Sequence, residues 1–203
     1  MDIKKIVEQA EIVYKFRHRS PIRAPGVVIG TAMVSLGLEQ LKDVKKLGAV
    51  AEARACLSDA VQALTGCTVG NKYLKIYDEI GRYAIVLYDR IDGKGLRVFI
   101  DLKKIIEAET PELYKFFHRK RAPEVQYDME ARALSAKKVI KEFLEINHDI
   151  FGVENVMIKH LEKEVILPAK VCVICGESFT CGNNDVKSCL VCSKKQDYYS
   201  VRS

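Results

Sequence analysis

Two Cys-x-x-Cys pairs near the end of the chain constrain its folding more than any other feature of the sequence. They are Cys172-Val-Ile-Cys175 and Cys189-Leu-Val-Cys192, and thirteen residues separate them. Each pair can place two thiolates on one ion, and two pairs complete the tetrahedral four-sulfur site that zinc prefers in proteins. Gly176 follows the first pair directly and permits the tight turn that such a site needs. We therefore predict one Zn²⁺ ion per chain, bound by these four cysteines.

The predicted zinc site is structural. Four thiolates leave no open coordination position, so the ion activates no water, and its binding contributes on the order of 10 kcal/mol to the folding of so small a module. The sequence predicts a short hairpin over residues 178–188, with its tip at residues 182–184. Another cysteine, Cys181, lies between the pairs and is interpreted as a spare thiol. An iron centre or free thiols are the alternatives for the four paired cysteines.

Composition and cysteine placement indicate a reduced protein built from two parts. The chain has 203 residues, of which 48% are hydrophobic, so it can bury a core without disulfide staples. Seven cysteines are present and five of them follow residue 171, which indicates metal binding in a reducing compartment. The N-terminal residues lack the apolar core of a signal peptide, and no apolar run is long enough to cross a membrane. We expect a cytoplasmic protein with domains at residues 1–165 and 166–203.

The hydrophobic pattern predicts an α+β domain in which helices pack on a mixed or antiparallel sheet. Residues 26–41 are apolar on nearly every side, which indicates a buried helix. Gly66 predicts the left-handed end of a short helix that Ser58 or Asp59 caps. A tight turn is expected over residues 92–95. The other expected helices cover residues 2–16, 101–118 with a break at Pro111, and 128–146, the expected strands cover 48–54, 73–77, 83–88 and 96–100, and residues 154–168 are expected to be partly extended.

A motif in the middle of the chain carries a family resemblance. Residues 56–70 follow the pattern Cys-x-x-Asp-Ala-x-Gln-x-x-Thr-Gly-Cys-Thr-x-Gly, and Tyr-Asp-Arg at 88–90 precedes Gly-Lys-Gly-x-Arg-Val at 93–98. These residues resemble the central motif and hairpin of the formylmethanofuran dehydrogenase E-subunit family, whose members commonly end in a Cys-x-x-Cys zinc module. The resemblance covers about residues 5–105 and the tail.

The resemblance implies an α+β domain that forms a homodimer, and a metal or cofactor pocket associated with a His-Gly-His-x-Cys-Pro-Gly motif near the N-terminus. Aligned on Pro25-Gly26, residues 20–24 read Ser-Pro-Ile-Arg-Ala, so both histidines and the cysteine of that motif are missing. A histidine lies nearby, but arginines flank it, and positive charge disfavours a bound cation. We expect a pocket altered toward anions, with Arg17, His18, Arg19, Arg23, Cys56 and Cys67 as its candidate ligand-binding residues.

Cys56 and Cys67 are eleven positions apart. If the segment between them is helical, their Cα atoms lie roughly 13 to 16 Å apart, which is too far for a disulfide or a shared ion. A cysteine at a helix N-terminus has a lowered thiol pKa, so Cys56 is the candidate nucleophile of an alternative function, that of a thiol-dependent enzyme. The simpler alternative is that both cysteines are small buried hydrophobic residues.

A second basic cluster lies at residues 115–121, Lys-Phe-Phe-His-Arg-Lys-Arg, and mixes aromatic residues with cations. If it meets the arginines at 17–23, the two clusters form a site for a phosphate, a carboxylate or a nucleic-acid backbone. Solvated helix ends explain the same residues more simply. Residues 170–203 carry five cations and three acids, a balance too small to favour nucleic-acid binding. The first hypothesis is therefore a zinc-binding accessory protein that binds a small anion or a larger complex.

Overall fold

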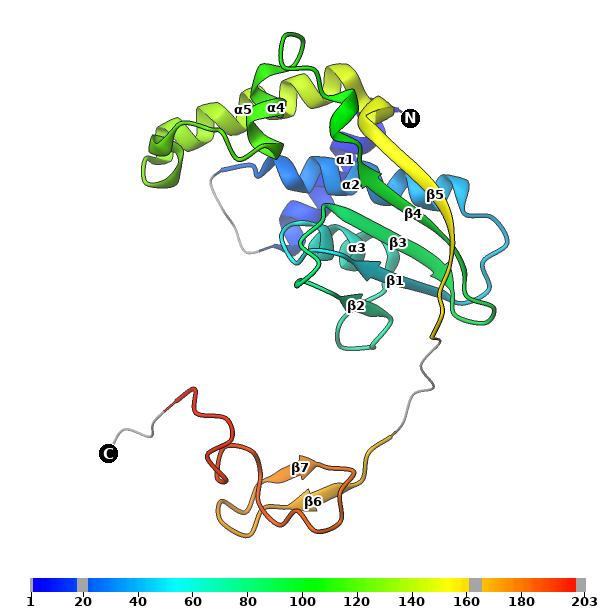
Figure 1. Ribbon diagram of the computed structural model, residues 1–203, viewed down its shortest axis with the longest axis vertical. Helices are drawn as coiled ribbons and strands as arrows, with labels where there is room; N and C mark the ends of the chain where they lie inside the picture. The colour runs from blue at the N-terminus through cyan, green and yellow to red at the C-terminus, as the bar shows by residue number, and fades with distance from the viewer. Residues whose placement is uncertain (1, 18–21, 161–165, 200–203) are drawn as a thin grey trace. The chain divides into compact units, whose positions relative to one another are not determined.

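A computed structural model describes residues 2–17, 22–160 and 166–199 (Figure 1). Contacts divide the chain into two units, an N-terminal unit at Met1–Leu161 and a C-terminal unit at Glu162–Ser203. Each unit is described by itself. Among the described residues, no helix has the length and apolar character that a membrane span requires.

The N-terminal unit contains a five-stranded mixed sheet with the strand order β2-β1-β3-β4-β5. β1 (Leu47–Ala51) pairs in parallel with β2 (Leu74–Ile76) and antiparallel with β3 (Ala84–Asp89). β4 (Lys94–Ile100) then joins β3 to β5 (Phe151–Met157), and both of these pairings are antiparallel. The expected α+β class and mixed sheet are confirmed.

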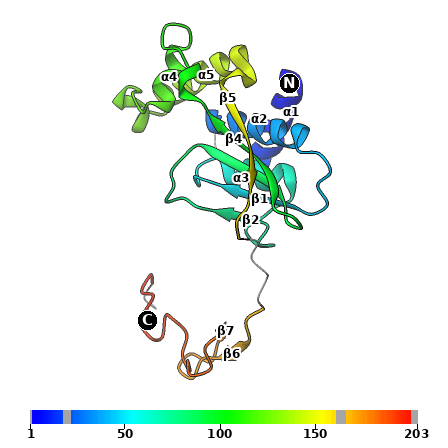
Figure 2. The same ribbon diagram turned by 45° about the vertical axis from the view of Figure 1, so that its right-hand side comes forward.

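Helices cover one face of this sheet (Figures 1 and 2). α2 (Pro25–Gln40) packs on β3 and β4, and α3 (Leu57–Thr65) packs on β1 and β2. Every residue of α2 from Pro25 to Gly37 is buried, in agreement with the helix expected to be apolar all round. α1 (Ile3–Phe16) packs against α2 and α3, while α4 (Pro111–Phe117) and α5 (Met129–Ile146) pack against each other.

The opposite face of the sheet carries a smaller apolar cluster of Val50, Val86 and Tyr88. The register places Val50 directly opposite Val86, so the two side chains share this face. Because strand residues alternate between faces, Glu52, two positions after Val50, and Arg97, directly opposite Val86, lie on the same side. This second face leads to the candidate site.

Local structure corrects several expected boundaries. Cys56 itself occupies the N-cap of α3 without a side-chain cap bond, so the capping role expected of Ser58 or Asp59 is wrong. The Ser58 hydroxyl instead donates to the carbonyl of Arg54 at 3.0 Å. Gly66 ends α3 in the left-handed region at φ 71°, as expected. The hairpin turn comes earlier than residues 92–95, since β4 already begins at Lys94.

The C-terminal unit contains one antiparallel hairpin of β6 (Ala169–Val171) and β7 (Ser178–Thr180). Lys170 lies opposite Phe179, so the hairpin turn encloses the first Cys-x-x-Cys pair. The hairpin expected over residues 178–188 is therefore wrong. The strand at 178–180 pairs backwards with the segment before the cysteines, and not forwards across residues 182–184.

Candidate functional site

The four paired cysteines of the C-terminal unit converge on one point. The Sγ atoms of Cys172, Cys175, Cys189 and Cys192 all lie within 4.8 Å of one another, which forms a group that can hold one metal ion. Zinc–sulfur bonds of about 2.3 Å in a tetrahedron separate the sulfurs by about 3.8 Å, so this donor set fits zinc. All four positions of such a tetrahedron are protein sulfurs, which is typical of a structural site.

Backbone groups prepare these sulfurs to bind a cation. The N–H of Cys189 donates to Cys172 Sγ at 3.3 Å, and the N–H of Cys192 donates to Cys189 Sγ at 3.4 Å. Backbone hydrogen bonds from Cys175 and Cys189 lower the pKa of Cys172 to about 6. Gly176 turns the chain after the first pair at φ 76°. Cys181 lies outside the group, with its Sγ 3.6 Å from the carbonyl of Asn183.

A cavity of about 480 Å³ lies in the N-terminal unit, beside the start of α2 and the end of β4. We call it the first cavity. An aromatic wall of Tyr83, Phe99, Phe116 and Phe117 lines it. A second cavity of about 490 Å³ lies next to it and extends toward α5. Both cavities are lined by Gly26, Cys56, Phe116 and Arg121.

Cys56 lies where the two cavities meet. A Cβ atom built on Gly26 would approach Cys56 Sγ to 3.1 Å and the Tyr83 hydroxyl to 2.8 Å, so only glycine fits between them. The Tyr83 hydroxyl donates to the Gly26 carbonyl at 2.7 Å. Burial lowers the pKa of Arg17, but a hydrogen bond with Cys56 and the nearby Asp59 carboxylate outweigh it and raise that pKa.

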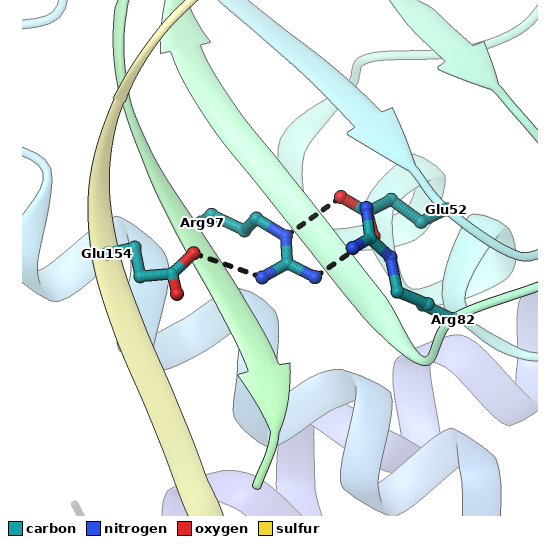
Figure 3. A network of polar contacts seen from close by, with 4 residues as sticks. All are labelled: Glu52, Arg82, Arg97 and Glu154. Carbon is teal, nitrogen blue, oxygen red and sulfur yellow. Dashed lines mark hydrogen bonds and ion pairs between the residues drawn. The ribbon is translucent and has the colours of Figure 1, made fainter. Parts of the chain in front are cut away.

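Two of the four arginines around the first cavity are neutralised by carboxylates (Figure 3). Glu52 accepts from Arg97 Nε at 2.8 Å and Nη2 at 3.0 Å, and it pairs with Arg82 Nε at 2.8 Å. Arg97 Nη1 also donates to Glu154 at 3.0 Å. Burial raises the pKa of Glu52, but the two guanidinium groups outweigh it and leave this pKa below its ordinary value. Two cations thus face two carboxylates in this network.

The other two arginines of the first cavity, Arg119 and Arg121, form no ion pair within the described part of the chain. Burial and the positive charges of Arg119 and Arg132 lower the pKa of Arg121. Arg132 lines the second cavity and donates to the backbone carbonyls of Val125 and Gln126. These three residues, Arg119, Arg121 and Arg132, are the arginine cluster of the site. Its charge is the excess positive charge of the two cavities.

The candidate residues from the first basic segment fall in different places. Arg17 contacts Cys56 and pairs with Asp59 at 3.2 Å. Arg23 pairs with Glu11 and lies over the Tyr14 ring, with its Cζ 5.3 Å from the ring centroid. His18 and Arg19 lie outside the described residues. Among the described candidates, therefore, Arg23 already has an acidic partner, and Cys56 lines both cavities.

Cys67 has a buried position apart from both cavities. Its side chain is 2% exposed, and its Sγ lies 3.5 Å from the Leu47 carbonyl. Burial raises the pKa of the Cys67 thiol, although a hydrogen bond with Thr65 opposes this effect. Asn71 Nδ2 donates to the Gly66 carbonyl at 2.8 Å, which closes the loop around Cys67. The Thr-Gly-Cys-Thr-x-Gly tract thus forms a tight turn.

Sequence reasoning did not single out Glu52, Arg82 or Arg97 as site residues. Arg97 belongs to the Gly-Lys-Gly-x-Arg-Val pattern, which offered the one available signal. The other quoted motif has a structural role, because Asp89 accepts from the N–H groups of Lys45 at 2.8 Å and Ile91 at 2.9 Å. A strand arginine and a glutamate 45 positions away meet only once the sheet has formed.

The fold and the cysteine group define a class of protein, an α+β domain joined to a small module with four clustered cysteines. A family model described as "FmdE, Molybdenum formylmethanofuran dehydrogenase operon" matches residues 22–151. The chain therefore belongs to the FmdE family, and the resemblance to the E-subunit family of formylmethanofuran dehydrogenase is confirmed.

A solved structure and a curated relative support this assignment. The structure is of an FmdE-like protein of the tungsten formylmethanofuran dehydrogenase type from Syntrophus aciditrophicus, 32% identical, with a TM-score of 0.77. That match covers 96% of this chain and 95% of the other. The relative is a probable S-adenosyl-L-methionine-binding protein of Archaeoglobus fulgidus, 32% identical over 190 residues. The match covers 91% of this chain but 51% of that relative, so the chain spans about half of its length.

Proposed function

We propose that this protein binds a small anionic ligand in the first cavity and carries a structural zinc ion in its C-terminal unit. The observation that carries the proposal is the arginine cluster. Arg119 and Arg121 line the cavity without an acidic partner among the described residues, while Arg82 and Arg97 beside them are neutralised. Like charges held together destabilise a fold unless an anion joins them.

The cavity suits a small molecule in size and lining. Its volume of about 480 Å³ falls within the range of ligand pockets in proteins. Apolar and aromatic residues line most of it, and a few charged groups converge on it, which is typical of a site that orients a ligand. The name of the Archaeoglobus relative assigns no ligand to this chain, since about half of that protein lies outside the match.

A thermal shift experiment with inorganic phosphate tests the anion proposal. Phosphate is expected to raise the melting temperature of the zinc-loaded wild-type protein at low salt, because a ligand that binds only the folded state stabilises it. The Arg121→Gln variant should lose this shift. The matched control is Lys141→Gln, which removes one cation from an exposed position on α5. Equal shifts in both variants would contradict the site.

Zinc is proposed as the metal, in one equivalent per chain, because four cysteine sulfurs within 4.8 Å of one another match its preferred coordination. When bound, the ion would fix the two Cys-x-x-Cys turns of the C-terminal unit. We further propose an accessory role in the cytoplasm, as a homodimer or within a larger complex. Light scattering of the purified protein tests the homodimer, and a monomer mass at micromolar concentration would contradict it.

A thiol-dependent reaction at Cys56 is the second candidate function. The observation that favours it is the position of Cys56 in the wall of both cavities, in contact with the Arg17 guanidinium. A cation next to a thiol stabilises the thiolate, which is the nucleophilic form. Rapid, stoichiometric alkylation of Cys56 at neutral pH would support this candidate, and slow labelling would count against it.

A further inference from the structure

We infer that the ligand of the first cavity is a phosphate monoester whose organic part is an aromatic ring. This inference deepens the proposed function and rests on it. It combines three features of the cavity: the size of the uncompensated charge, the backbone conformation that presents Arg119, and the aromatic wall.

The charge around the cavity selects a doubly charged anion. The network of Glu52, Arg82, Arg97 and Glu154 has as many carboxylates as guanidinium groups, so it contributes no excess charge. Arg119 and Arg121 contribute two positive charges without acidic partners in the described structure. The nearest acid that acts on Arg121, Glu112, already pairs with Lys115 at 3.1 Å. A carboxylate would neutralise one of the two charges, whereas a phosphate monoester carries about −1.5 to −2 at pH 7.

The position of Arg119 is conformationally costly. The N–H of Lys120 donates to the carbonyl of Lys115 at 2.9 Å, and that of Arg119 to the carbonyl of Phe116 at 3.4 Å, which is the Schellman end of a helix. Glycine usually occupies the left-handed residue of this motif, but here Arg119 adopts it at φ 58°. Such strain persists where a side chain has a function. At this position the guanidinium belongs to the wall of the first cavity.

The aromatic wall provides a surface for the organic part of the ligand. Phe117 packs edge-on against Tyr83 at 5.5 Å and against Phe116 at 5.1 Å between ring centroids. Arg121 lies over Phe116 with its Cζ 4.9 Å from the ring centroid. The anion-binding guanidinium and the aromatic rings are therefore adjacent, and a ring joined directly to a phosphate can contact both. Aromatic contacts of this kind add about 0.5 to 1.5 kcal/mol beyond area burial.

Titration calorimetry with three probes tests the inference on the full-length, zinc-loaded protein at low salt. The probes are inorganic phosphate, phenyl phosphate and benzoate. Phenyl phosphate is expected to bind about tenfold more tightly than either of the others, because it alone engages both the arginines and the aromatic wall. Phe116→Leu should bring phenyl phosphate down to the affinity of inorganic phosphate, and Arg121→Gln should weaken both phosphates.

The outcomes separate this inference from the proposed function. If inorganic phosphate binds as tightly as phenyl phosphate, the aromatic part of the inference is wrong and the anion site stands. If benzoate binds as tightly as phenyl phosphate, the ligand class is a carboxylate and the inference is wrong. If none of the three probes binds, the inference and the proposed anion site both fail. Because these comparisons use the wild-type protein, they hold even if a variant does not fold.

Discussion

The carboxylate of Glu52 accepts two hydrogen bonds from the guanidinium of Arg97, from Nε at 2.8 Å and from Nη2 at 3.0 Å. The Glu52 side chain is 7% exposed and that of Arg97 is 14% exposed, so both charges lie largely out of water. Such a bidentate pair fixes the orientation of both side chains. It keeps Arg97 occupied in the wall of the first cavity and leaves the arginine cluster to meet a ligand.

Glu52→Gln should destabilise the N-terminal unit by about 2 to 3 kcal/mol, because it removes the charge that faces Arg97 and Arg82. The cost is below that of a fully buried pair, since the Arg82 side chain is 62% exposed. Urea unfolding followed by circular dichroism measures the change. Glu39→Gln, in an exposed pair with Lys5, is the control and should change stability by less than about 0.5 kcal/mol. Equal effects of the two substitutions would contradict a stabilising network.

The contribution of Glu52 should depend on pH in a definite direction. Its pKa is lower in the folded state than in the unfolded chain, because Arg97 and Arg82 together outweigh the effect of burial. A carboxyl group of this kind stabilises the fold above its unfolded pKa, and the contribution is lost as the pH falls through its folded pKa. The stability difference between wild type and Glu52→Gln should thus be full at neutral pH and should vanish in acid. A constant difference would contradict the assignment.

Much of the fold could be predicted from sequence where the signal is local. The apolar run of α2, the left-handed glycine after α3 and the spacing of the four cysteines each report on neighbouring residues. The hairpin of the C-terminal unit is misplaced from sequence because Gly182-Asn183-Asn184 is a good turn sequence, while the true partner of β7 is a segment before the cysteines. Strand pairing is decided by such non-local contacts, which a turn motif does not reveal.

The candidate anion site was only partly predictable for the same reason. The basic segment at residues 115–121 is visible in the sequence, but its share of free charge depends on which acids lie close in the fold. Arg23 has Glu11 as a partner, whereas Arg121 has like charges around it. Neither arrangement follows from charge counting along the chain. A sequence shows which cations exist, and the fold decides which of them remain uncompensated.

Arg119→Gly should stabilise the protein and weaken phosphate binding at the same time. Glycine adopts φ 58° freely, whereas an L-residue at this conformation costs about 1 kcal/mol or more. The melting temperature should therefore rise by about 2 to 4 °C. Phosphate affinity should fall by about tenfold, because the substitution removes one of the two unpaired guanidinium groups of the first cavity.

Lys72→Gly is the matched control for this trade-off. Lys72 also has a positive φ, 63°, but it lies outside the residues that line the two cavities. The substitution should raise the melting temperature by a similar amount and leave phosphate affinity unchanged. Differential scanning calorimetry and titration calorimetry give the two readouts. If Arg119→Gly binds phosphate as well as Lys72→Gly does, Arg119 has no role in the site.

Cys175→Ser should abolish zinc binding, because three sulfurs and a hydroxyl hold the ion far more weakly than four thiolates. Elemental mass spectrometry should find one zinc per wild-type chain and almost none in the variant. Amide signals of the C-terminal unit should lose dispersion in NMR spectra, since metal binding supplies most of the folding free energy of such a module. Cys181→Ser is the control and should retain its zinc, because Cys181 lies outside the cysteine group. Loss of zinc from both variants would contradict the four-ligand assignment.

Alkylation should distinguish the two cysteines of the N-terminal unit. Cys56 lines both cavities, whereas Cys67 is 2% exposed and burial raises the pKa of its thiol. In the zinc-loaded Cys181→Ser protein, iodoacetamide should modify Cys56 at least about tenfold faster than Cys67, because the accessible thiolate is the reacting form. Peptide mass spectrometry over a time course measures both rates. Saturating phenyl phosphate should slow the labelling of Cys56 and leave that of Cys67 unchanged, whereas equal rates for the two thiols would show that Cys56 is closed to ligands.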